Sequence, residues 1–256
     1  MTVETRIPAA IERARDEQAT VDAKLTAYDT FVDRVRNVTT DVVSGGVSAP
    51  TGTTVATGTN RGGCAAVRDA FDATVRDVAG VADGESVFET MAGELGEELA
   101  VALAPTTGSA LTPAFKEQVV SAATDRRFQL RTMASALERE VSSLENASEA
   151  VETIREWVDR ADGTPLTALD FDDLRERHDR LDDCLGRCER QARTRQTLLN
   201  GSTGEHGRVG LEHRCLVDYL YEDLPVDHPV LDGVTAVVAT CERCQRNVRA
   251  HLTRCV

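Results

Sequence analysis

Lysine is nearly absent from this 256-residue chain, because only Lys24 and Lys116 among its 29 basic residues are lysines. Aromatic residues are also scarce, at 4% of the chain, whereas acidic residues number 43 and set a formal net charge of −14. Excess carboxylates keep a protein soluble in concentrated salt, where the Debye length falls to about 3 Å at 1 M. The composition therefore predicts a protein of a halophilic cytoplasm. The alternative is an ordinary acidic cytosolic protein.

Long apolar segments are missing as well. The longest apolar run, Leu99–Ala104, is far shorter than the roughly 20 residues that a bilayer-spanning helix needs. The first ten residues, MTVETRIPAA, lack the basic and then apolar regions of a signal peptide. We therefore expect a cytoplasmic protein with no membrane role.

Signatures of nucleic-acid binding and of catalysis are absent too. The negative charge disfavours binding to a phosphate backbone, which depends on clustered lysine and arginine. The glycine-rich residues 39–63 do not end in the Gly-Lys-Ser/Thr of a phosphate loop, and no GxGxxG, HExxH or GxSxG occurs. We therefore expect no nucleic-acid partner and no enzymatic activity.

Apolar residues at helical spacing dominate the rest of the sequence. They predict one helix from Ile7 to about residue 36, and a second of about 49 residues from Pro113 to about Ala161. Thr112 supplies the cap of the second helix and Pro113 its first residue. Further helices are expected over 64–78, from the capping residue Ser86 to 102, from the capping residue Asp170 to 199, over 209–222, and from 229 nearly to 256.

The predicted fold is all-α, an elongated antiparallel helical bundle or coiled coil with long helices. A 49-residue helix spans about 73 Å, whereas a compact chain of this length has a radius of gyration near 18 Å. We expect the helices between 113 and 199 to form an antiparallel pair on which the first helix packs. Residues 1–256 are expected to form a single helical domain with a flexible Gly/Ser/Thr-rich loop at about 39–63. A detached amino-terminal coiled coil is the alternative.

Two cysteine pairs have the spacing of metal ligands, Cys184-x3-Cys188 and Cys241-x2-Cys244. Four thiolates brought together hold zinc tetrahedrally, so these four residues are the candidate metal site. Three histidines lie near them in the sequence: His178, His213 and His251.

Helical geometry favours another interpretation of the same cysteines. At 100° per residue, Cys241 and Cys244 share one face with Val248, and Cys188 lies within an apolar stripe with Cys184 at its edge. Cysteine on such a face acts as a small buried hydrophobe. The arginines of residues 241–256 lie opposite that face, which weakens their role as thiol activators. Buried structural thiols are therefore favoured over a metal site, and a metal site over a redox pair.

Five segments carry a resemblance to a known family: IPAAIERARDEQ near the start, GCAAVRDAF at 63–71, ALAPTTGSALTP at 102–113, and DYLYEDLPVDHPVL and CERCQRNVRAHLTRC near the end. They resemble an uncharacterised haloarchaeal family of helical proteins, a domain of unknown function. The resemblance covers most of the chain and implies a helical fold and a salt-rich archaeal cytoplasm. It implies no activity and no site residues.

The long apolar stripes suggest a function in protein interaction. Only a few polar residues interrupt them: Gln18, Arg126 and Arg195. We expect a non-enzymatic helical scaffold or protein-interaction module, which binds a protein partner or itself through helical faces and needs no cofactor. The alternative is a zinc- or thiol-based sensor that uses the CxxxC and CxxC pairs.

Overall fold

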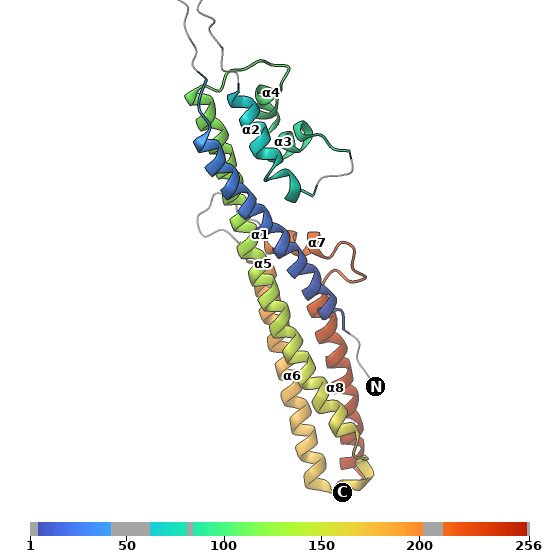
Figure 1. Ribbon diagram of the computed structural model, residues 1–256. Helices are drawn as coiled ribbons and strands as arrows, with labels where there is room; N and C mark the ends of the chain where they lie inside the picture. The colour runs from blue at the N-terminus through green and yellow to red at the C-terminus, as the bar shows by residue number, and fades with distance from the viewer. Residues whose placement is uncertain (1–4, 42–61, 81–83, 202–211, 255–256) are drawn as a thin grey trace, which may run out of the picture. The chain divides into compact units, whose positions relative to one another are not determined.

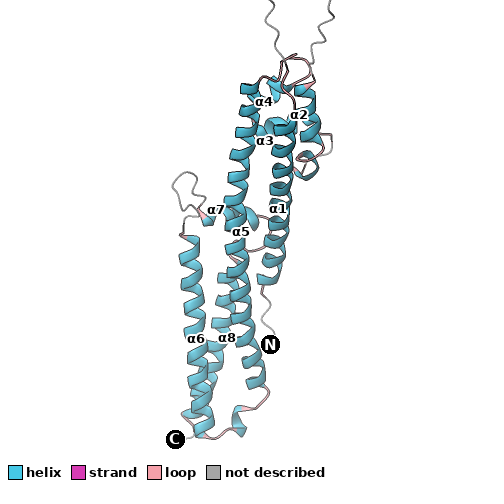
Figure 2. Cartoon of the chain, turned by 60° about the vertical axis from the view of Figure 1, so that its left-hand side comes forward, coloured by secondary structure: helices cyan, strands magenta, loops and turns pink. Residues whose placement is uncertain are grey.

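The computed structural model describes residues 5–41, 62–80, 84–201 and 212–254, and within these ranges the chain is helical, without strands (Figure 2). The prediction of an all-α fold with long helices is confirmed. The elements are α1 (Ile7–Asn37), α2 (Gly63–Asp72), the 3-10 helix η1 (Arg76–Val78), α3 (Val87–Leu95), α4 (Glu97–Leu103), α5 (Pro113–Asp162), the 3-10 helix η2 (Leu166–Ala168), α6 (Phe171–Leu199), α7 (His213–Leu220) and α8 (Pro229–Leu252). Among the described residues, no helix combines the length and the apolar character that crossing a bilayer requires.

The predicted helix caps are present. The Thr112 hydroxyl accepts a hydrogen bond from the backbone N–H of Phe115 at 3.1 Å, so the 50-residue α5 begins at Pro113 as expected. Asp170 caps α6 by accepting from the Asp173 N–H at 2.8 Å, and Asp173 bonds back to the Asp170 N–H. Each cap satisfies an N–H that has no partner inside its helix, which explains why both boundaries are visible in the sequence.

The segment from 86 to 102 differs from the prediction of one continuous helix. Ser86 and Glu89 form the expected capping box, but the chain breaks at Gly96 into α3 and α4. Gly96 has φ 100°, a left-handed conformation that glycine adopts without the steric penalty of a side chain. The apolar spacing continues across the break, so the sequence pattern gives no sign that the helix ends there.

The chain divides into two compact units, Met1–Gln18 with Ser135–Val256 (unit 1) and Ala19–Ala134 (unit 2). Helices α1 and α5 contribute residues to both units. The expectation of a single domain stays a prediction.

Unit 2 has an aromatic centre. Phe31 of α1 meets Tyr28 of the same helix and Phe71 of α2 edge-to-face, at ring-centroid distances of 6.5 and 5.7 Å. All three rings are buried. Edge-to-face contacts of this kind add to the stabilisation from apolar burial, so these three rings help to hold α1 and α2 together.

Most of the predicted loop at 39–63 lies outside the described residues, but its two ends meet at Asp41. The buried Asp41 carboxylate accepts hydrogen bonds from the backbone N–H groups of Gly63, at 3.2 Å, and of Leu111, at 2.7 Å. The Asp41 N–H donates to the Leu111 carbonyl at 2.9 Å. A Cβ at position 63 would lie 2.7 Å from the Leu111 Cβ, so this close approach requires glycine. These hydrogen bonds hold the beginning of α2 against Asp41, a few residues after the end of α1.

Unit 1 contains α6 and α8, which pack side by side in antiparallel directions, with the second half of α5 beside them (Figure 1). The short 163–170 connection makes α5 and α6 antiparallel neighbours, as predicted. The first turn of α1 packs on the first turns of α8, where a Cβ at Gly233 would lie 3.0 Å from the Ile7 side chain. The buried faces of these helices position the residues described next.

Candidate functional site: a buried polar network and a thiol cluster

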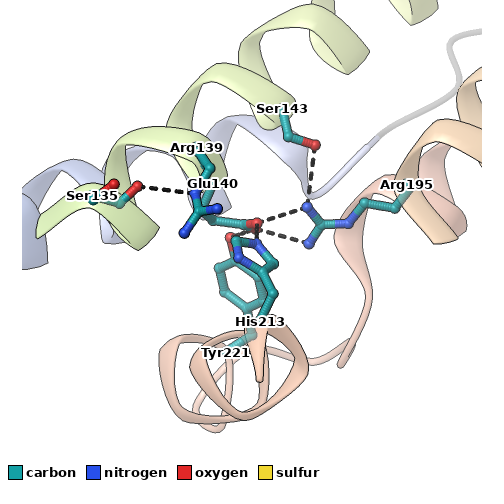
Figure 3. A network of polar contacts seen from close by, with 7 residues as sticks. All are labelled: Ser135, Arg139, Glu140, Ser143, Arg195, His213 and Tyr221. Carbon is teal, nitrogen blue, oxygen red and sulfur yellow. Dashed lines mark hydrogen bonds and ion pairs between the residues drawn. The ribbon is translucent and has the colours of Figure 1, made fainter. Parts of the chain in front are cut away.

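A fully buried carboxylate, Glu140 of α5, is the centre of a polar network in unit 1 (Figure 3). Arg195 donates to both of its oxygens, at 2.7 and 2.8 Å. The Tyr221 hydroxyl donates at 2.6 Å, and His213 Nε2 lies 2.7 Å from Oε2. Because an ionised carboxylate only accepts, His213 carries a proton on Nε2. The side chains of Glu140 and Arg195 are 0% and 1% exposed, so this is a buried bidentate ion pair.

The network joins three helices. Glu140 belongs to α5 and Arg195 to α6, whereas His213 begins α7 and Tyr221 follows its last residue. Arg195 Nη1 also lies 3.3 Å from the hydroxyl of Ser143, one turn after Glu140. A pair with such specific geometry fixes which turn of α5 faces which turn of α6. The ion pair is therefore expected to set the register of α5 against α6, which is the best-attested role of buried polar groups.

The ionisation of Glu140 is set by its partners. Burial alone would raise its pKa, but hydrogen bonds from His213, Arg195 and Tyr221 outweigh burial and hold the pKa at about 2. Burial, and then the Glu140 charge, raise the pKa of Tyr221 far above its ordinary value. At neutral pH the carboxylate is therefore ionised and the phenol is protonated. Neither group is suited to acid–base chemistry near pH 7, and the network acts as a fixed ion pair.

A groove of about 440 Å³ lies beside the network. Ser143 and Arg195 belong both to the network and to the groove wall. Other lining residues are Arg139, Asn146, Gln191 and Val230. The ion pair thus keeps one wall of the groove in a defined position.

Only part of this network has a signal in the sequence. Arg195 interrupts the apolar stripe of α6, and a charge at a buried position requires a partner. Glu140 was not singled out, because Leu137, Val141 and Leu144 already define the stripe around it. His213 was considered only as a nearby imidazole, and the structure places its Nε2 against Glu140.

The four candidate metal ligands do not group as their sequence pairs suggest. Cys184 and Cys188 of α6 and Cys241 of α8 are buried, whereas Cys244 is intermediate in exposure. Cys184 and Cys241, on the packed helices α6 and α8, lie near enough to influence each other's pKa. Cys244 lines a small pocket of about 100 Å³ beside Trp157. The strongest influence therefore runs between the two motifs, although Cys184 also acts on Cys188, and Cys244 on Cys241.

The thiols of this cluster influence one another. The neighbouring Cys241 lowers the pKa of Cys184 against the effect of burial, and the nearby Arg180 and Arg187 lower it further. Cys184 and burial raise the pKa of Cys241. Burial, and then the Cys184 charge, raise the pKa of Cys188 to about 11. Cys184 is therefore the thiol of the cluster that ionises first.

The described part of the chain contains no group of three or more His, Cys, Asp and Glu residues placed to hold a metal ion. The zinc site at Cys184, Cys188, Cys241 and Cys244 stays a prediction. His178 lies beside Asp179, at 3.6 Å, and His251 Nδ1 lies 3.0 Å from the carbonyl oxygen of residue 247.

Comparison with known proteins identifies a family without a described activity. Searches of curated proteins and of solved structures found no match. A family model matches residues 5–245, which is nearly the whole chain. The chain therefore belongs to the family described as a domain of unknown function, DUF7260.

Proposed function

We propose that this protein is a non-enzymatic helical scaffold or interaction module of a halophilic archaeal cytoplasm, which binds a protein partner or a second copy of itself through helix faces. Long helices with filled apolar stripes provide a rigid framework. The Glu140–Arg195 pair fixes the register of two of them. An interaction module also needs an exposed binding surface.

The observation that carries this proposal is the exposure of Phe128 on α5. Its side chain is 55% exposed, and the charged residues Asp125 and Arg131, one turn away on either side, are exposed as well. An aromatic anchor with a polar rim is typical of an interface hot spot. Four other large apolar side chains are also exposed: Phe88, Val101, Phe171 and Tyr219.

Light scattering in molar KCl tests the self-association form of this proposal. We expect the wild-type mass to exceed that of one chain at high protein concentration, and Phe128→Ser to return it to one chain. Phe171→Ser is the matched control, because Phe171 is also an exposed aromatic, at the first residue of α6. We expect it to leave the mass unchanged.

Affinity purification followed by mass spectrometry tests the form with another partner. We expect one protein to be retained by the wild type and by Phe171→Ser, and lost by Phe128→Ser. Helicity measured by circular dichroism checks that both variants fold. A monomer that retains the same proteins with and without Phe128 would contradict the proposal.

The halophilic part of the proposal rests on composition. A net charge of −14, with only two lysines among 29 basic residues, implies mutual repulsion that concentrated salt screens. We expect helicity by circular dichroism to rise steeply from dilute to molar KCl. Full helicity in dilute buffer would contradict this part.

A zinc- or thiol-based sensor is the second candidate function, and the placement of Cys184 and Cys241 on two helices that pack against each other favours it. Elemental analysis of protein purified in high salt without added metal tests the zinc form. A zinc content near one per chain, lost in Cys184→Ala, would support it. Less than about 0.1 zinc per chain would exclude it.

A further inference from the structure

The groove beside the Glu140 network is formed by three helices. Its lining residues come from the middle of α5, the second half of α6 and the first turn of α8. All three segments belong to unit 1. The volume of about 440 Å³ is within the range typical of sites that hold small molecules. The groove is therefore large enough for a ligand of metabolite size.

Neutral polar side chains form much of the groove wall. Two hydroxyls and two amides are prominent among them: Ser142, Thr194, Asn146 and Gln191. Three of the four side chains are exposed and Gln191 is half-buried. Within the described ranges, none of them is engaged by another side chain. Because hydroxyls and amides both donate and accept, this wall suits a ligand whose own groups do the same.

Arg195 adds a buried donor that has no acceptor. Both of its Nη atoms bind Glu140 (Figure 3). Its Nε is buried and has no hydrogen-bond partner among the described residues. The guanidinium is a planar fork, so this N–H points in a different direction from the two bonds to Glu140. A buried donor without an acceptor is destabilising, and Arg195 lines the groove, so an oxygen of a bound ligand would satisfy it.

The charges around the groove balance. Arg139 and Arg195 are positive, whereas Glu138 and the Arg195 partner Glu140 are negative. The site therefore has no net attraction for an anion or for a cation. Its described lining residues also include no aromatic ring on which a nucleobase could stack. These features favour a small neutral ligand over a nucleotide or a metal ion.

We propose that this groove binds a neutral, hydroxyl-rich molecule, a mono- or disaccharide, to which the Arg195 Nε–H donates a hydrogen bond. Sugar hydroxyls donate and accept, and two neighbouring hydroxyls match the two ends of one amide, such as that of Gln191. The C–H groups of the sugar meet the apolar side chains of Leu198 and Val230. This inference goes beyond the proposed function and depends neither on the exposed aromatic residues nor on the cysteines.

The buried ion pair prepares this site for a ligand. Glu140 holds the guanidinium by two bonds and Ser143 lies 3.3 Å from Nη1, so the Nε–H is oriented before binding. A donor that is already fixed lowers the entropic cost of binding. Since the ligand is neutral, screening by salt does not weaken its hydrogen bonds as it weakens an exposed ion pair. The affinity is therefore expected to be insensitive to KCl.

An NMR titration of the full chain in molar KCl tests the proposal. Glucose, galactose, mannose and maltose are added separately. We expect at least one of them to shift the Arg195 Nε–H signal and the side-chain amide signals of Asn146 and Gln191. The shifts should saturate at millimolar sugar, and the affinity should be the same when the KCl concentration is doubled.

Substitutions of the amides locate the binding site. Gln191→Ala and Asn146→Ala are each expected to weaken binding of that sugar by roughly tenfold, because each removes hydrogen bonds to the ligand. Gln196→Ala is the matched control, since Gln196 is an exposed glutamine on the same helix outside the described groove lining. It should leave the affinity unchanged. Circular dichroism checks that the three variants fold.

Potassium phosphate serves as the probe for an anion site, and we expect it to leave the three signals in place. Three results would overturn the inference. The first is the absence of a saturable shift with all four sugars. The second is a shift of the same signals by phosphate and not by the sugars. The third is equal affinity of Gln191→Ala and Gln196→Ala for the sugar.

Discussion

Each compact unit contains one glutamate that accepts hydrogen bonds from a tyrosine and an arginine. In unit 1, Tyr221 and Arg195 bind Glu140, with His213 as a third partner. In unit 2, Tyr28 and Arg126 bind Glu94, each at 2.9 Å, and Lys24 approaches it at 3.6 Å. The two networks contain the same kinds of polar group but differ in how deeply they are buried.

The degree of burial decides how much each of these two polar networks contributes to stability. The Glu94 side chain is 10% exposed and that of Arg126 is 33% exposed, so water and salt reach this pair. Glu140 and Arg195 have almost no exposure. Removing one partner of an exposed pair leaves a charge that water solvates, whereas a buried charge left alone has no such compensation. The same bonds are therefore expected to be far more costly to break in unit 1.

The largest difference is expected on removing the arginines. Arg195→Met leaves the Glu140 charge without its ion-pair partner and is expected to lower the free energy of unfolding by about 3–5 kcal/mol. Denaturant unfolding in molar KCl, followed by fluorescence of Trp157, measures this, because the single tryptophan lies in unit 1. The double variant Glu140→Met/Arg195→Met should recover much of the loss. An equally large loss in the double variant would contradict the uncompensated charge as the cause.

The next largest difference between Glu140 and Glu94 is expected in how stability depends on pH. The pKa of Glu140 is about 2 in the folded protein and near the ordinary value of about 4.3 in the unfolded chain. The depressed pKa stabilises the fold fully above about pH 5, and this contribution, of about 3 kcal/mol, is lost as the pH falls towards 2. Burial raises the pKa of Glu94, but Arg126 and Tyr28 lower it overall, so its contribution has the same sign.

Unfolding followed by Trp157 fluorescence between pH 7 and 2 tests this expectation. Glu140→Gln should flatten the acid dependence of the free energy of unfolding strongly. Glu94→Gln, followed by circular dichroism, should flatten it less. Equal slopes for Glu140→Gln and the wild type would show that Glu140 does not retain its charge on folding.

The tyrosines give a smaller contrast. Tyr221→Phe removes a bond to a fully buried charge and is expected to cost about 1.5–3 kcal/mol, the range for hydrogen bonds to ionised groups. Tyr28→Phe removes the corresponding bond to Glu94, whose exposed edge water can solvate, and should cost less. Midpoints of chemical unfolding by circular dichroism compare the two. A larger loss for Tyr28→Phe would reverse the proposed order of the two units.

The smallest effect is expected at Arg126. Arg126→Met should cost about 1 kcal/mol or less, since the pair is partly solvated, and the cost should shrink further in molar salt. The cost of Arg195→Met should hardly depend on salt, because ions do not enter the buried site. Parallel unfolding series at increasing KCl concentration compare the two variants. A salt-independent cost at Arg126 would remove the distinction between the units.

The sequence by itself determined the elements of this fold. Caps such as Thr112 and Asp170, the Pro113 start and the long apolar stripes act within a few residues of one another, so they can be read along the chain. The break at Gly96 was not predicted, because the apolar spacing continues on both sides of it and a glycine inside a helix pattern does not have to end the helix.

Only the tertiary structure decided which side chains meet. Arg195 was visible as a charge in an apolar stripe, but its partner Glu140 lies on another helix at a position that the stripe does not mark. Cys184 and Cys241 each belong to a close sequence pair, yet the residue that most influences the pKa of each is the other one. Such contacts depend on which helices pack and in what register, and that is set by the burial of whole helix faces and not by the spacing of any one motif.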